Sequence, residues 1–276
     1  PYFEGGAMYT NYNFNAPSSI SQGFASLPIA NGYNNSNNNQ PIYSKTMPVY
    51  TCPSDQAPAA TFINMPNQPL QLYEANSVVR GNYLFSTADL TDYSREYGYY
   101  IAILNSAWGN LATDPVSWHI GVFGTDGAAT MAQIRDGTSS TVAMGESKQG
   151  IQGQGKTSTS YGPFWGAGVH TCCHGRTTLS LSANSWGTFT TGTVTFGAYS
   201  WTGYTDVFYS QINFDESLQA GRQLQYAWQF GSYHPAGAQF VMCDGSVKFI
   251  NQDIDYFNVF VWLNRIADQH QVNLPN

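Results

Sequence analysis

The dipeptide Asp244-Gly245 constrains the fold more than any other short feature, because an apolar run lies on each side of it. Asp-Gly in this setting favours a β-hairpin, since a type I′ turn needs positive φ at both central residues. With the dipeptide at the centre of the turn, four cross-strand pairs are predicted: Cys243 with Ser246, Met242 with Val247, Val241 with Lys248, and Phe240 with Phe249. Successive pairs alternate between the faces of a sheet, so the second and fourth pairs place their apolar side chains on one face.

Around this hairpin the patterns predict a β-rich α+β fold. A helix is expected at residues 254–267, with Asp253 as its N-cap and a broad apolar stripe. A second, short helix is expected at 131–135, between Thr130 as its cap and Gly137 as its stop. The remaining expected elements are a helical turn at 4–12, an edge strand at 46–52, and strands at 81–86, 120–123, 140–144, 194–201 and 207–214. We expect a single domain over 1–276, and 149–198 is left open as an inserted loop or lobe.

Composition excludes several classes of protein. Only 10% of residues are charged, against about a quarter in an ordinary soluble chain, and 15% are aromatic. Abundant tyrosine combined with few charged residues is typical of an extracellular β-rich protein. The chain also has too much apolar and aromatic surface to bury for it to be disordered. The net charge of −7 gives no basic footprint, so we expect no nucleic-acid partner. No run of 18 apolar residues is present, so nothing in the chain is expected to span a membrane.

The four cysteines are Cys52, Cys172, Cys173 and Cys243, an even number that permits two disulfides. Adjacent cysteines rarely bond to each other, so we expect Cys243 to bond with one of the adjacent pair. The segment His170, Cys172, Cys173 and His174 also offers soft ligands for zinc or copper. Adjacent cysteines are poorly placed on one tetrahedral ion, so a disulfide with surface histidines is the preferred interpretation.

Catalytic patterns are present but incomplete. Residues 150–157 match the phosphate-binding pattern G-x4-G-K-[ST], but no helix pattern follows them, so we interpret them as a Gly-rich loop. His234 could act as a base oriented by Asp244, but no nucleophile motif accompanies it. The preferred interpretation is structural: His234 hydrogen-bonds across the base of the hairpin, and Asp244 shapes the turn. We therefore expect no enzymatic activity.

Two ligand classes stay open. Loop carboxylates and amides could bind calcium, although no EF-hand spacing places a site, and we otherwise expect no cofactor. Aromatic residues in Gly- and Ser-rich segments could stack on sugars, but core or subunit-interface positions are more usual. These aromatic residues are Trp186, Tyr199, Trp201 and Tyr204.

Several segments, in order along the chain, resemble a large bacterial family of prepilin-like proteins, the domain of unknown function 1559. His234, nine residues and then Asp244-Gly245 resemble its H-X9-DG signature. The other matching segments are 1–4 (PYLE in the family), 52–55 (CPSD), and 134–141 followed by 145–147 (ITDGTSNT and GES). The resemblance marks His234, Asp244, Gly245, Asp136, Gly137 and Glu146 as motif residues.

The resemblance implies the globular head of a pilin-like (type II secretion pseudopilin-like) protein with an antiparallel sheet. The long apolar N-terminal helix of such proteins is not in this chain; it was either removed or lies outside this sequence, and Cys52 could have its disulfide partner there. The implied role is a structural subunit of an extracellular filament, pilus or pseudopilus, acting by self-association with copies of itself or other pilin-like subunits. Membrane contact would then come only through the missing helix. The alternative is a cell-surface module that binds a glycan or another extracellular ligand.

Overall fold

A computed structural model describes part of the 276-residue chain. The described residues are 5–15, 39–55, 63–64, 74–75, 79, 81–88, 120–124, 127–148, 163, 165, 173–175, 177, 193–196, 199–202, 211–213, 229–270, 272 and 274. Within these residues no helix has the length and apolar character needed to cross a membrane. The predicted single domain and the predicted lobe at 149–198 stay predictions.

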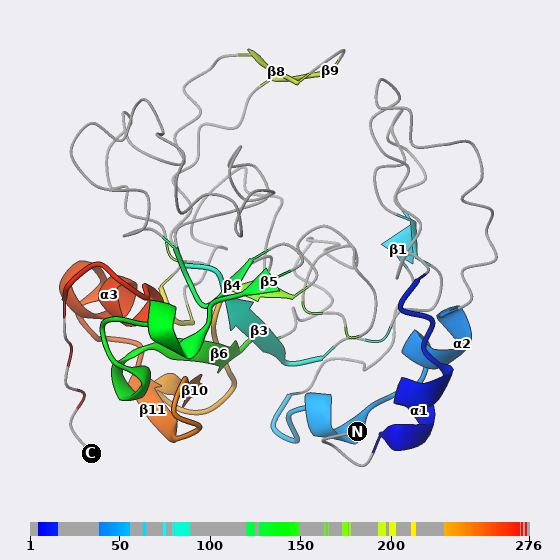
Figure 1. Cartoon of the computed structure of the whole chain (residues 1–276), viewed down its shortest axis with the longest axis horizontal. Coiled ribbons are helices and arrows are strands. Elements are labelled where there is room, and N and C mark those ends of the chain that lie inside the picture. Colours follow the sequence, from blue (N-terminus) through cyan, green and yellow to red (C-terminus); the bar gives the residue numbers. More distant parts are fainter. Residues whose placement is uncertain are drawn as a thin grey trace.

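A five-stranded sheet organises the described part of the chain, in the order β11-β10-β6-β3-β7 (Figure 1). All neighbouring strands are antiparallel except β3 and β7, which are parallel. The predicted antiparallel sheet is therefore wrong at this edge, and the sheet is mixed. The strands are β3 (Tyr83–Ser86), β6 (Val142–Glu146), β7 (His174–Gly175), β10 (Gly237–Met242) and β11 (Val247–Asn251).

Smaller elements surround the sheet. Three two-stranded pairs are β1 (Ile63–Asn64) with β2 (Glu74–Ala75), β4 (Phe123–Gly124) with β5 (Gly127–Ala128), and β8 (Thr193–Phe196) with β9 (Tyr199–Thr202). The short helices near the N-terminus are α1 (Gly6–Asn11), α2 (Gln40–Tyr43) and η1 (Pro48–Tyr50). Two 3₁₀ helices precede β6, namely η5 (Met131–Gln133) and η6 (Thr138–Ser140).

The expected strands at 81–86 and 140–144 are confirmed as β3 and β6, and the helical turn at 4–12 as α1. The expected edge strand at 46–52 is wrong, because Pro48 begins the 3₁₀ helix η1. Proline has a φ suited to the first turn of a helix and cannot donate to a strand ladder. The expected strand at 194–201 is instead the hairpin β8–β9, and most of 207–214 lies outside the described residues.

The predicted hairpin is confirmed, but its register is shifted by one residue. Val241 pairs with Val247 and Phe240 with Lys248, instead of Val241 with Lys248. The amide of Gly245 donates to the carbonyl of Met242, and Gly245 has a φ of +86°. The loop therefore has a type I turn closed by glycine in the left-handed region, the usual three-residue hairpin loop, and not a type I′ turn.

The register shift reverses the exposure of β11. Val247 and Phe249 are 62% and 46% exposed, whereas Phe240 and Met242 are buried on the other face. The predicted apolar face that combined these four residues is thus wrong. A one-residue slip turns every side chain of a strand to the opposite face, because the side-chain period is two.

The helix after the hairpin is shorter than expected. A π-helical turn, η8 (Tyr256–Phe260), leads into α3 (Val261–Asn264), instead of one helix over 254–267. Asp255 and not Asp253 accepts the hydrogen bond of the first turn, from the amide of Asn258 at 3.0 Å.

This helical segment covers one face of the sheet. Phe230, Phe240 and Phe260 are fully buried and pack edge-to-face, with ring centroids 5.3 to 6.1 Å apart. Gly145 of β6 faces them, since a Cβ there would lie 2.5 Å from the Phe240 ring. The phenylalanine core therefore lies on the face of the sheet to which Gly145 belongs.

Candidate functional site

Glu146, the last residue of β6, points away from the phenylalanine core. Side chains alternate along a strand, so Glu146 lies on the opposite face from Gly145. Its side chain is only 6% exposed. Its Oε2 accepts a hydrogen bond from the backbone N–H of Gln239 at 2.7 Å. A buried carboxylate is thereby held with its second oxygen, Oε1, directed elsewhere.

His234 lies in the loop just before β10. Its backbone N–H donates to Ser232 Oγ at 3.0 Å, and Ser232 Oγ donates to the carbonyl of Gly237 at 2.6 Å. These local bonds form a compact turn, which ends with Ala236 at a φ of +65°. The turn directs the His234 ring toward Glu146, with Nε2 at 3.3 Å from Oε1.

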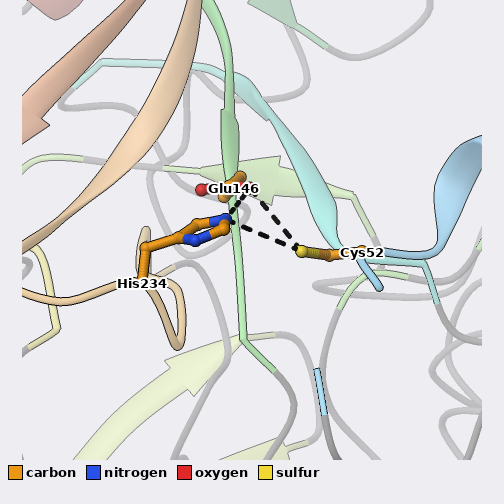
Figure 2. A group of neighbouring side chains, drawn as sticks. All are labelled: Cys52, Glu146 and His234. Atoms are coloured by element: carbon orange, nitrogen blue, oxygen red, sulfur yellow. Dashed lines mark hydrogen bonds and ion pairs between the residues drawn. The ribbon is translucent and has the colours of Figure 1, made fainter. Parts of the chain in front are cut away.

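Cys52 reaches the same place from the N-terminal part of the chain, after η1. Its thiol is buried and lies 3.8 Å from Glu146 Oε1 and 3.9 Å from His234 Nε2. Figure 2 shows the three side chains directed toward one another from three separate segments. We call Cys52, Glu146 and His234 the three-residue cluster.

Asn82, at the start of β3, connects the segments that carry the cluster. It is 2% exposed. Its Oδ1 accepts from the Cys52 amide at 2.8 Å, and its Nδ2 donates to the carbonyl of Ser147 at 3.2 Å and to the Asp55 carboxylate. Buried polar groups of this kind keep their hydrogen bonds, so Asn82 determines how Cys52 approaches β6.

A small pocket adjoins the cluster. Cys52 and Glu146 contribute to its wall, together with Ser54, Asp55 and Lys148. Ser54 Oγ lies 2.9 Å from Cys52 Sγ. The buried thiol of Cys52 and the carboxylate of Glu146 thus share one partly open pocket.

The arrangement does not suit a nucleophilic relay. Such a relay needs the nucleophile at one ring nitrogen of histidine and the orienting carboxylate at the other. Here Cys52 Sγ and Glu146 Oε1 both face Nε2 of His234. Three donor atoms converge on one point, which is the geometry of a shared ligand.

The pairing of His234 with Asp244 as a catalytic dyad is wrong. The six-residue strand β10 separates them, which corresponds to about 20 Å. Asp244 Oδ1 instead accepts from the amide and hydroxyl of Ser246, at 2.8 and 2.6 Å, and these bonds lower the pKa of Asp244. The structural role of Asp244-Gly245 in the turn is confirmed, whereas His234 bonds to β6 and not across the hairpin base.

Asp136 and Gly137 form a structural turn away from the cluster. The Asp136 carboxylate is buried and accepts from the amides of Asp268 and Gln269, at 2.8 and 3.0 Å. Burial raises the pKa of Asp136. Gly137 has a φ of +98°, which favours glycine. Asp136 therefore connects the turn before β6 to the C-terminal segment.

The cysteines do not form the expected disulfide in this structure. Cys52, Cys173 and Cys243 are not disulfide-bonded, and Cys172 lies outside the described residues. Burial, aided by Asp244, raises the pKa of Cys243 to about 11. Of the weaker metal candidates, Cys173 Sγ and His174 Nε2 lie 3.9 Å apart, and His170 is outside the described residues.

Sequence reasoning identified the members of the cluster but not their association. Cys52 was assigned to a disulfide, and Glu146 and His234 to structural motifs. One sequence signal points to their association, because each of the three residues lies in a segment that resembles a family motif. These segments are 52–55, 145–147 and the H-X9-DG signature. Asn82 gave no sequence signal. The side chains of the aromatics expected to stack on sugars are not among those described, so the glycan alternative stays a prediction.

Comparison with known proteins relates the chain to a protein family. The family model described as "Protein of unknown function (DUF1559)" matches residues 1–256 of the chain. No curated protein and no solved structure matches. All three members of the cluster lie within the matched range.

Proposed function

We propose that this chain, which belongs to the family of proteins of unknown function DUF1559, is a structural subunit of an extracellular, prepilin-like filament. Its H-X9-DG and related segments are the basis for likening it to pseudopilins. Its role is assembly with copies of itself, and not turnover of a substrate.

The observation that supports this proposal most is the exposed edge strand β11. In the described sheet β11 pairs only with β10, so its other edge has no strand partner. Val247 and Phe249 expose 62% and 46% of their surface on this strand. Unpaired edges bearing apolar side chains are templates for association with another chain. Lys248, between them, limits this association to a partner that accommodates its charge.

A second exposed aromatic surface is present at α1. Tyr9 and Phe14 are 54% and 65% exposed, and their rings lie 5.1 Å apart. In Figure 1, α1 and β11 lie on opposite sides of β3. Contact between two different surfaces of identical subunits produces an open filament when the rotation does not close. We propose that β11 of one copy meets the α1 surface of the next.

The charge composition is consistent with this assembly. Only 10% of residues are charged, so few charged side chains would lose their water when two copies meet. Abundant tyrosine suits interfaces, where its amphipathic ring contributes contact area at low entropic cost.

Polymerisation of the purified chain tests the proposal. Sedimentation velocity and negative-stain electron microscopy across a concentration series should show filaments for the wild type. The double variant Val247→Asp, Phe249→Asp should remain monomeric, because it places charges on the proposed contact. Met131→Asp, at a residue that is 67% exposed on η5, is the matched control and should still assemble. A wild type that stays monomeric at every concentration, or a double variant that still forms filaments, refutes the proposal.

A further inference from the structure

The three-residue cluster combines a thiol, a carboxylate and an imidazole at contact distance. These are the three side-chain types that bind zinc in proteins. Cys52 and Glu146 are buried, and the side chain of His234, in the loop before β10, is 37% exposed. Each of these residues offers one ligand atom, and the three atoms all lie within 4.8 Å of one another. Among the described residues, this is the group of three such donors that meets that distance.

The spacing of the donor atoms matches a tetrahedral ion. Zinc at its usual bond lengths places nitrogen and oxygen ligands about 3.4 Å apart, and sulfur about 3.6 Å from either of them. The observed separations are 3.3 Å between His234 and Glu146, 3.8 Å between Cys52 and Glu146, and 3.9 Å between Cys52 and His234. They agree within about 0.3 Å, so an ion can enter with only small side-chain movement.

Further contacts hold two of the donors in place. Gln239 N–H binds Oε2 of Glu146, which leaves Oε1 for a ligand. The Ser54 hydroxyl lies 2.9 Å from Cys52 Sγ and can donate to a thiolate. Zinc sites rely on such second contacts to orient the ligands. The adjoining pocket is lined by Cys52 and Glu146, so the cluster is open on that side to a fourth ligand.

We propose that Cys52 Sγ, Glu146 Oε1 and His234 Nε2 bind one Zn²⁺ ion, with a water in the fourth position. The ion joins the segment after η1, the end of β6 and the loop before β10. Cys52 lies 94 residues from Glu146 and 182 from His234 in the chain. A bond between segments so distant in sequence holds the N-terminal region against the sheet, as a disulfide would. The proposal does not depend on whether the chain forms filaments.

Zinc titration of the reduced, chelator-treated full chain tests the proposal. Competition with a chromophoric chelator should give one Zn²⁺ per chain and a rise in Tm on loading. Cobalt in place of zinc should give a thiolate-to-metal charge-transfer absorption, which identifies a cysteine ligand. Failure of the wild type to bind at millimolar zinc would overturn the proposal.

Variants assign the ligands. Cys52→Ser, Glu146→Gln and His234→Gln should each weaken zinc binding by more than about tenfold, since even outer-shell changes cost that much. Cys52→Ser should also abolish the charge-transfer band. Cys173→Ser is the matched control, because Cys173 is not a member of the three-residue cluster and its loss should leave the affinity unchanged. If circular dichroism shows that the Glu146 or His234 variant is unfolded, the assignment is decided by comparing the cobalt spectra of the wild type and of Cys52→Ser. Unchanged affinity in folded Cys52→Ser, or loss of binding in Cys173→Ser, would refute the assignment.

Discussion

Phe240 and Phe249 lie on the same hairpin but on opposite faces, so their truncation should have very different costs. Phe240 is fully buried between the edges of Phe230 and Phe260, with ring centroids 5.3 and 5.6 Å away. Phe249 pairs with Gln239 and is 46% exposed. The two substitutions remove the same atoms, so their difference reports the register of β11.

The magnitudes follow from burial. Replacing a buried phenylalanine with alanine costs about 3–5 kcal/mol, a sum that includes two aromatic pairs at about 0.5–1.5 kcal/mol each. Phe249 buries about half of its side chain, and full burial contributes about 1.5–3 kcal/mol, so Phe249→Ala should cost about 1 kcal/mol. Total stabilities are about 5–15 kcal/mol, so the difference is large enough to measure.

Urea unfolding at low protein concentration, followed by tryptophan fluorescence, measures both free energies. Phe240→Ala should lower the free energy of unfolding by at least about 2 kcal/mol more than Phe249→Ala. Equal losses would mean that both rings share the core face. That result would refute the observed register and support a two-residue turn centred on Asp244-Gly245.

Three further predictions test packing and protonation. Gly145→Ala should cost about 1–3 kcal/mol of unfolding free energy, because its Cβ would lie 2.5 Å from the Phe240 ring; Gly6→Ala, with open space around it, should show no loss in the same urea titration. Burial raises the pKa of Asp136 above 3.8, so the stability contributed by its protonated form is present below pH 3.8 and lost as pH rises through the raised value. Asp136→Asn should therefore gain stability relative to the wild type as pH rises through that window. Urea titrations from below pH 3.8 to neutrality measure this, and a difference in unfolding free energy between the two proteins that stays constant with pH would contradict it. The pKa of Cys243 is about 11, against an ordinary 9.0, so alkylation of this thiol at pH 8 should be about 100-fold slower in the native protein than in urea. Mass spectrometry measures both rates, and similar rates would show that the thiol is not shielded.

The local elements could be predicted where a short pattern determines them. Asp244-Gly245 between apolar runs predicted the hairpin, and Gly81 to Ser86 predicted β3, because these signals act within a few residues. The register of β11 could not be predicted, since two loop types accept the same dipeptide and both give an alternating pattern. The burial of Ile250 in the core, with Phe249 exposed, distinguishes between them.

Much of the candidate site was also present in the sequence, as separate residues. Cys52, Glu146 and His234 stand in three segments that resemble the family's motifs, so each could be singled out from its neighbours. Their association could not be predicted, because the patterns give no distance between residues 94 and 182 positions apart. An even number of cysteines favours a disulfide for Cys52, and Asp244 is much nearer to His234 in the chain than Glu146 is.

The family, the hairpin, the turn residues and the polar side chains of the motifs can therefore be inferred from the amino-acid sequence alone. Which of those side chains meet depends on how the strands assemble. Short-range signals depend on backbone preferences of adjacent residues, whereas the three-residue cluster depends on the order of strands in the sheet and on the buried contacts of Asn82. The structure thus brings one thiol, one carboxylate and one imidazole together on the face of β6 opposite the phenylalanine core.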